Sequence, residues 1–148
     1  MKNSFLFIFL TIFLISNIYA GKLSDIKIFN SNSDYVTYEV EIVTLPEEQE
    51  RGLMFREKLK IKEGMLFIFD SPKIASFWMK NTLIPLDLIY IKKSGLIDSI
   101  HQDLEPMSLK KIKSKSKVKA VLEIPGGDSR LYDINDHSFI NIDMIEGN

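Results

Sequence analysis

The stretch YVTYEVEIV, residues 35–43, alternates apolar and polar side chains along its whole length. The apolar side chains that share one side of an extended chain are Val36, Tyr38, Val40 and Ile42. Successive side chains of a β-strand point to opposite faces, so this pattern predicts a strand with one face in a core and the other toward water.

Further short strands are predicted along the rest of the chain. They are short apolar or alternating runs separated by turn sequences such as DSP at 70–72, KSG at 93–95 and PGG at 125–127. The runs are residues 64–69, 74–80, 86–91, 96–100, 117–124 and 138–145. Seven or eight short strands with little helix predict a mainly β fold, either a sandwich or a partly closed barrel, and α+β at most.

One or two short helices complete the predicted architecture. In TLPEEQERG, residues 44–52, Thr44 and Glu47 have the spacing of a capping box, and Gly52 is placed to end the helix. Residues 128–134 can form one or two further helical turns. No internal repeat or linker divides the chain, so we expect a single domain over residues 21–148.

Residues 1–20 have the features of a signal peptide. The run FLFIFLTIFLI at 5–15 follows a short segment whose side chains carry only the charge of Lys2, and Ala20 suits cleavage before Gly21. An uncleaved anchor is the alternative, although this run is a little short to span a bilayer. We therefore expect an exported protein that is periplasmic, or extracellular where there is no outer membrane, without a membrane span after cleavage.

Composition excludes several classes of protein. The 148 residues contain 19 Lys and Arg, 20 Asp and Glu, two His and no Cys, for a formal charge of −1. A general nucleic-acid binder would be strongly basic, so no nucleic-acid partner is expected. Without Cys there is no thiol for a lipid anchor and no disulfide framework.

Three segments resemble one widespread prokaryotic family, the domain of unknown function 192. They are ERGLMFRE at 50–57, EGMLFIF at 63–69 and FWMKNTLIPLDLIYI at 77–91, and a later Leu-Glu pair precedes the glycines at 126 and 127. The resemblance covers about residues 35–145. One departure is NDH at 135–137, where relatives tend to have a Gly-Asp turn. The resemblance implies a mainly β fold and export, and it implies no mechanism.

The segment FWMKNT is the central candidate for a binding site. If residues 74–80 form a strand, Trp78 and Lys80 lie on one face, with Asn81 in the following turn. An apolar or sugar ring could stack on Trp78 while Lys80 and Asn81 donate hydrogen bonds. The structural alternative is that Trp78 packs in the core, Lys80 extends to solvent and Asn81 satisfies turn backbone groups.

Three charged residues are candidate neighbours of this site. Arg51 and Arg56 could hold an anionic group, or they could form structural ion pairs with Glu47, Glu50, Asp87 or Glu123. Asp87 lies among apolar residues in LIPLDLIYI, so it is edge-exposed, tuned for function, or paired with a cation such as Arg51 or Lys80. Pairing is the interpretation we favour.

Two other chemistries remain open as alternatives. An acid–base enzyme could use Asp87 with His101, and a copper-handling protein could use His101 with thioethers, which select Cu(I). The methionines concerned are Met54, Met65, Met79 and Met107. Because methionines in apolar runs are ordinary core residues, no metal site and no cofactor are predicted.

Residues 110–119, KKIKSKSKVK, contain six lysines. They could contact an anionic envelope polymer, but a solvated loop leading into the next strand is the interpretation we favour. Taken together, the sequence predicts a binding or accessory module for a small polar ligand or a cell-envelope polymer. Its predicted ligand-binding residues are Trp78, Lys80, Asn81, Arg51, Arg56 and Asp87.

Overall fold

The strand predicted from YVTYEVEIV is present with the expected bounds, as β2 (Tyr35–Val43). The structure is a computed structural model, which describes residues 22–142. Val36, Tyr38 and Val40 are buried, as the alternation predicts. The predicted leader at residues 1–20 and its cleavage site before Gly21 lie outside the described residues.

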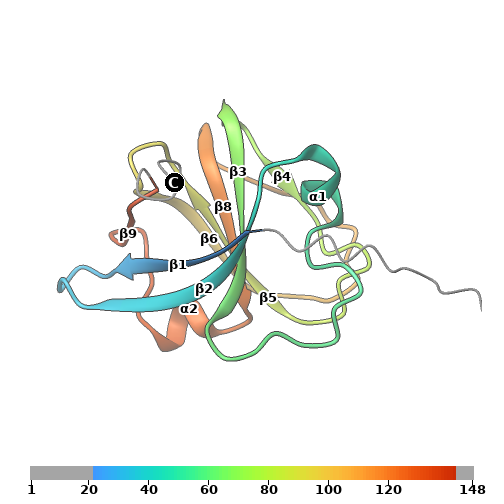
Figure 1. Cartoon of the computed structure of the whole chain (residues 1–148), viewed down its shortest axis with the longest axis horizontal. Coiled ribbons are helices and arrows are strands. Elements are labelled where there is room, and N and C mark those ends of the chain that lie inside the picture. Colours follow the sequence, from blue (N-terminus) through green and yellow to red (C-terminus); the bar gives the residue numbers. More distant parts are fainter. Residues whose placement is uncertain (1–21, 143–148) are drawn as a thin grey trace, which may run out of the picture.

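Seven strands form one curled sheet, and two short strands form a second (Figure 1). The large sheet has the order β6-β5-β8-β3-β2-β1-β9, and β4 pairs with β7 in the small one. The remaining strands are β1 (Lys22–Phe29), β3 (Glu63–Lys73), β4 (Ser76–Phe77), β5 (Leu86–Ile91), β6 (Ile97–Leu104), β7 (Ile112–Lys113), β8 (Val118–Pro125) and β9 (Phe139–Ile140). The mainly β prediction is therefore confirmed, and the shape is a half-barrel with two short helices.

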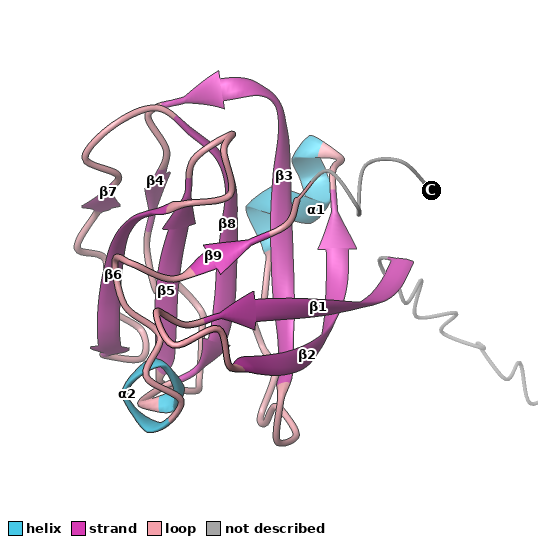
Figure 2. Cartoon of the chain, turned by 90° about the vertical axis from the view of Figure 1, so that its left-hand side faces the viewer, coloured by secondary structure: helices cyan, strands magenta, loops and turns pink. Residues whose placement is uncertain are grey.

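Among the strand pairs of residues 22–142, only β2 and β3 run parallel; the others are antiparallel. A parallel pair needs a crossover connection, and helix α1 (Pro46–Arg51) lies within it. The second helix, α2 (Asp128–Leu131), follows β8. In Figure 2 the strand β1 and the first part of β2 run crosswise to β3, β5 and β8, which shows that the sheet is curled.

Both faces of the sheet are covered, which explains its continuous apolar runs. One hydrophobic cluster, the inner core, fills the inside of the curl and includes Tyr38, Leu66 and Leu122. The other, the outer core, lies on the opposite face beneath α1 and β4 and includes Leu53, Phe67 and Val121. Every residue of β5 is buried, because this strand lies in the middle of two cores.

The curl is closed by the turn between β5 and β6. The amide of Ile140 donates to the carbonyl oxygen of Gly95 at 3.0 Å, and Leu96 forms a bridge with Phe139. Gly95 has φ of +85°, and a Cβ there would lie 2.3 Å from the carbonyl oxygen of Ile140. Only glycine combines this backbone conformation with so close an approach.

Gly95→Ala is therefore expected to destabilise the protein by about 2–3 kcal/mol, through left-handed strain and a backbone clash. Gly127→Ala is the matched control. Gly127 has φ of +88°, but the nearest atom to an added Cβ is an Asp103 side-chain oxygen at 3.4 Å. Urea unfolding would measure both. Equal losses for the two variants would contradict the closing role of Gly95.

Several local predictions need correction. Helix α1 ends at Gly52 as expected, but its N-cap is Leu45, and no side chain caps it. The chain does not turn at residues 70–72, because β3 continues to Lys73 through a register shift. Of the strand predicted at 74–80 only β4 exists, and of that predicted at 138–145 the described part holds only β9. The short strand β7 lies within the lysine run that was interpreted as a loop.

Within residues 22–142, no helix has the length and hydrophobicity needed to cross a membrane.

Candidate functional site

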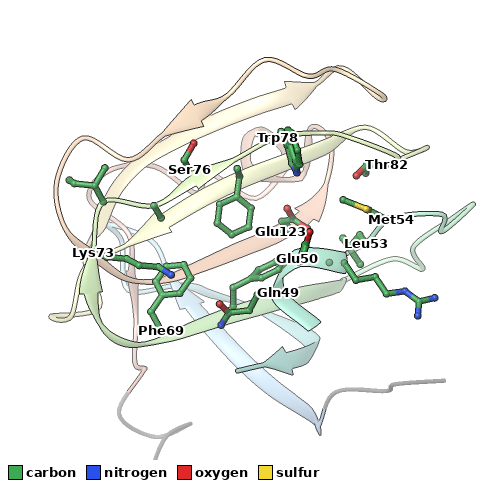
Figure 3. Close-up of a pocket in the computed structure, with 16 residues that line it drawn as sticks. Gln49, Glu50, Leu53, Met54, Phe69, Lys73, Ser76, Trp78, Thr82 and Glu123 are labelled. Atoms are coloured by element: carbon green, nitrogen blue, oxygen red, sulfur yellow. The ribbon is translucent and has the colours of Figure 1, made fainter. Parts of the chain in front are cut away.

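A cleft of about 340 Å³ opens between α1 with its following loop and the segment that joins β3 to β4 (Figure 3). Its lining combines aromatic rings, aliphatic side chains and a few polar groups. The lining residues are Gln49, Glu50, Arg51, Gly52, Leu53, Met54, Phe67, Phe69, Lys73, Ile74, Ala75, Ser76, Phe77, Trp78, Thr82 and Glu123.

The α1 side of the cleft is positioned by Gly52 and Gln49. Gly52 has φ of +49°, and a Cβ added there would lie 3.2 Å from the ring of Phe67, so the chain after the helix passes close to the sheet. Leu53 is then buried in the outer core. The Gln49 side-chain amide donates to the carbonyl oxygen of Ile68 at 2.8 Å, which ties the helix to β3.

The opposite side is held by hydrogen bonds between two loops. The amide of Ala75 donates to Ser114 Oγ, and the amide of Ser114 donates to the carbonyl oxygen of Ala75, both at 3.0 Å. Phe77 then packs edge-on against Phe67, with ring centroids 4.9 Å apart. The β4–β7 pair therefore forms a fixed wall.

Glu123 lies at the floor of the cleft, at the centre of the lining residues in Figure 3. It comes from β8, where it stands opposite Met65 on one side and Leu88 on the other. Its exposed fraction is 5%, and its carboxyl group makes no hydrogen bond or ion pair with residues 22–142. Burial raises the pKa of Glu123 to about 8, so the carboxyl group is mostly protonated at neutral pH.

The side chains of Trp78 and Lys80 are adjacent, although the strand predicted at 74–80 is shorter than expected and β4 ends at Phe77, before both residues. Trp78 lines the cleft and is 37% exposed, so it is not enclosed in the core. The ammonium nitrogen of Lys80 lies 5.0 Å from the centroid of the Trp78 ring. The loop after β4, rather than the pleat of a strand, brings the two side chains together.

Asn81 forms the turn that follows, with φ of +55°. Its carbonyl oxygen accepts a hydrogen bond from the amide of Phe55 at 2.8 Å, and its side-chain nitrogen donates to Met54 Sδ at 3.8 Å. Asn81 thus joins the two loops beside the cleft, and it is not among the residues that line it.

The two arginines have different environments. Arg51 is exposed and lines the cleft. Arg56 makes a two-pronged ion pair with Glu41 on β2, in which Nη2 donates to Oε2 at 2.6 Å. A structural ion pair was one of the predicted alternatives for Arg56, but Glu41 was not among the predicted partners.

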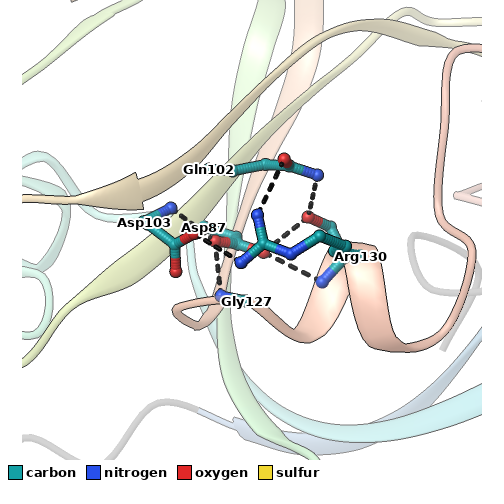
Figure 4. A network of polar contacts seen from close by, with 6 residues as sticks. Asp87, Gln102, Asp103, Gly127 and Arg130 are labelled. Atoms are coloured by element: carbon teal, nitrogen blue, oxygen red, sulfur yellow. Dashed lines mark hydrogen bonds and ion pairs between the residues drawn. The ribbon is translucent and has the colours of Figure 1, made fainter.

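Asp87 is fully buried and lies away from the cleft (Figure 4). Its carboxylate accepts hydrogen bonds from the amides of Asp103, Gly127 and Ser129 at 2.8–2.9 Å, and one from Ser129 Oγ. The predicted pairing with Arg51 or Lys80 is therefore wrong. Backbone amides at the start of α2 and on β6 satisfy this carboxylate instead.

Asp87 and His101 do not converge. Within β5 the buried side chains of Ile89 and Ile91 belong to the inner core, on the same face as Asp87. The ring of His101 contacts Tyr90, which belongs to the outer core, with centroids 5.8 Å apart. The two groups that the enzyme alternative requires thus lie on opposite faces of the sheet.

The four methionines of the copper alternative are dispersed. Met65 and Met79 are buried in the outer core, Met54 lines the cleft, and Met107 is 53% exposed. Met79 and His101 both line a second pocket, of about 380 Å³. Residues 22–142 contain no group of three or more His, Cys, Asp or Glu side chains arranged to hold a metal ion.

The lysine run is a structured edge of the fold. Ile112 and Ser114 point inward and are buried, while Lys111, Lys113 and Lys115 between and beside them are exposed. The amides of Lys115 and Ser116 both donate to Asp98, which fixes the turn after β7. Pairing with β4 therefore makes this run part of the wall behind the cleft.

Sequence reasoning missed the floor of the cleft. Glu123 was considered only as a partner for an arginine. The available signal was Val121, which shares its side of β8 with Glu123 and indicates that this side is covered too. The contributions of Gln49, Ser76 and Thr82 had no sequence signal, because they depend on how three loops meet.

Comparisons with known proteins agree with this fold. The model of the family DUF192, described as Uncharacterized ACR, matches residues 27–142. The structure of a candidate transcription regulator from Sinorhizobium meliloti 1021 is similar, with a TM-score of 0.81 and 29% sequence identity. The match covers 82% of this chain and 95% of the Sinorhizobium chain. A protein of unknown function from Novosphingobium aromaticivorans DSM 12444 has a TM-score of 0.80 and 28% identity, covering 84% of this chain and 89% of its own. No protein with a curated description matches.

Proposed function

Since this chain belongs to the uncharacterised family DUF192, whose description assigns no activity, we propose that it is an exported small-ligand-binding protein whose binding site is the cleft beside Trp78. The apolar leader at residues 5–15 supports export, and the periplasm, or the exterior where there is no outer membrane, is the proposed location.

The observation that carries this proposal is the carboxyl group of Glu123 at the floor of an apolar cleft. A buried polar group without a partner costs free energy, so such a group is uncommon unless a ligand or a reaction uses it. Concave apolar sites with a few convergent polar groups are typical of small-molecule binding sites. Glu123 lines such a site, and its carboxyl group makes no hydrogen bond or ion pair with residues 22–142.

Each lining group has a distinct proposed role. Trp78 provides a flat apolar surface for stacking, and the ammonium group of Lys80 helps to hold that ring in place. Arg51 neutralises a negative group at the mouth, while Glu123 recognises a polar group at the floor. Arg56 and Asp87 support the surrounding structure through Glu41 and the α2 amides, so they have no direct role in binding.

A small ligand fits this geometry better than a cell-envelope polymer does. The cleft has a volume of about 340 Å³, which suits a small molecule better than a chain of linked units, and the buried Glu123 is one of its lining residues. The description of the Sinorhizobium protein as a candidate transcription regulator does not extend to this chain, because a formal charge of −1 does not favour binding to nucleic acid.

Ligand capture from a cell-envelope extract tests the proposal. The full chain purified after export would be incubated with the extract, washed and analysed by mass spectrometry for bound small molecules. We expect a molecule whose capture falls about five- to tenfold in Trp78→Ala, because a stacked ring contributes about 1–1.5 kcal/mol. Lys80→Ala, which removes only the ammonium beside the ring, is expected to reduce capture by a smaller factor.

Tyr35→Ala is the matched control, since Tyr35 is an aromatic side chain that is 57% exposed and remote from the cleft lining. Its capture profile should equal that of the unmodified protein. A profile that is identical in the native protein, Trp78→Ala and Tyr35→Ala would contradict the assignment of the site.

A further inference from the structure

We infer that the ligand of this cleft is a small organic cation, a protonated amine on an apolar or aromatic body, whose ammonium group lies against the Glu123 carboxylate. This inference rests on the proposed function and names the ligand class of the same site.

The first argument is the character of the walls and floor. Aromatic rings carry negative potential on their faces, and the cleft is bordered by four of them: Phe67, Phe69, Phe77 and Trp78. Glu123 is the only carboxyl group at the floor, since Glu50 is exposed at the mouth. A cleft that combines these rings with the Glu123 carboxyl group matches the charge of an ammonium group.

The second argument is that rings around this cleft already attract ammonium groups of the chain itself. Lys73 Nζ lies 4.0 Å from the centroid of the Phe69 ring, and Lys80 Nζ lies 5.0 Å from that of Trp78. Each of these two ammonium groups therefore lies against one ring beside the cleft. The Glu123 carboxyl group forms no ion pair among the described residues, so that position suits the cation of a ligand.

The charged and titratable groups that face Glu123 leave it available. Arg51 from α1 and Lys73 from β3 line the cleft without an ion pair to it, and Glu50 lies at the mouth. Tyr90 on β5 is near enough to interact electrostatically, but its hydroxyl group donates to the carbonyl oxygen of Ile112 at 2.7 Å. Because burial holds the pKa of Glu123 at about 8, a cation must displace its proton below that pH.

The proposal therefore predicts a pH dependence. Affinity for an amine should rise by up to about tenfold per pH unit as the pH increases from 6 to 8, and then level off, because binding needs ionised Glu123. A neutral ligand that accepts a hydrogen bond from protonated Glu123 would show the opposite trend.

Phenethylamine and its neutral analogue 2-phenylethanol are the probes. Trp78 is the only tryptophan of the chain, so its fluorescence reports directly on the cleft, and ligand-observed NMR provides an independent measurement. We expect phenethylamine to bind at least about tenfold more tightly than 2-phenylethanol at pH 8, and Glu123→Gln to remove this difference. Glu39→Gln is the matched control, because it makes the same charge change at an exposed position on β2.

Each outcome is decisive. Preference for the amine, lost in Glu123→Gln and kept in Glu39→Gln, supports the inference. Equal binding of both probes, or preference for the alcohol, overturns the ligand class while leaving the cleft as a small-molecule site. If neither probe binds, the ligand class is also overturned, and envelope capture decides the proposed function separately.

Discussion

Replacing Asp87 with alanine is expected to destabilise the fold by about 3–5 kcal/mol. The substitution removes the acceptor for the amides of Asp103, Gly127 and Ser129, which would lose their partner in a largely buried place. Unpaired buried donors cost about 1–3 kcal/mol each before relaxation and entry of water. Urea unfolding measured by circular dichroism would give the difference.

Asp87→Asn and Asp103→Ala complete the experiment. Asparagine keeps one acceptor oxygen for the backbone amides but turns its NH2 group toward another donor. We therefore expect Asp87→Asn to destabilise the fold, but less than Asp87→Ala does. Asp103→Ala removes the exposed ion pair with Arg130 and places alanine at a φ of +49°, for which we expect a loss of about 1–2 kcal/mol. A loss below about 1 kcal/mol for Asp87→Ala would show that this carboxylate does not hold α2 to the sheet.

The second large effect is the pH dependence that Glu123 imposes on stability. Its pKa is about 8 in the folded protein, against an ordinary value of 4.5. Between these values the folded protein retains a proton that the unfolded chain releases, so the free energy of unfolding decreases as the pH rises through this window. The integrated decrease is up to about 5 kcal/mol, and it is complete above pH 8.

Glu123→Gln should abolish this decrease, because the amide resembles the neutral acid in shape and does not ionise. The variant is expected to be about as stable as the native protein at pH 4.5 and several kcal/mol more stable at pH 8.5. Urea unfolding of both proteins across this range isolates Glu123, since other titrating groups cancel in the difference. A pH-independent difference would show that the carboxyl group has an ordinary pKa.

A stabilising substitution at a cleft floor also bears on function. Natural proteins retain buried polar groups that lower stability where a ligand or a reaction needs them. If Glu123→Gln raises stability and removes the preference for phenethylamine, both results have one cause: a carboxyl group that is held in an apolar place for a partner.

Local pattern explains which parts of the fold could be predicted. YVTYEVEIV and LDLIYI match β2 and β5 in their bounds, because their apolar runs are as long as the strands and end at clear turns. Strand β1 was not predicted, since only Ile26 and Ile28 of its eight residues are buried and the alternation is too short to recognise. Strand β7 was missed because Ile112 is its only apolar residue.

The candidate site was predictable only in part. Trp78 and Arg51 line the cleft and Lys80 lies beside Trp78; the segments FWMKNT and ERGLMFRE had singled out these three residues, and their role in binding stays a prediction. Arg56 and Asp87 looked similar in sequence, yet Glu41 and the α2 amides hold them in structural positions. A charged residue among apolar neighbours shows that a partner is needed, but it does not show which group, distant in the chain, will supply it.

The amino-acid sequence alone determined the mainly β architecture and the family, because hydrophobic alternation and family motifs are properties of neighbouring residues. Only the tertiary structure decided that both faces of the sheet are covered, that β2 and β3 run parallel, and that Glu123 forms the floor of a cleft. The reason is physical: the burial of a carboxyl group depends on which distant segments pack over it, and a strand's own pattern does not contain that information.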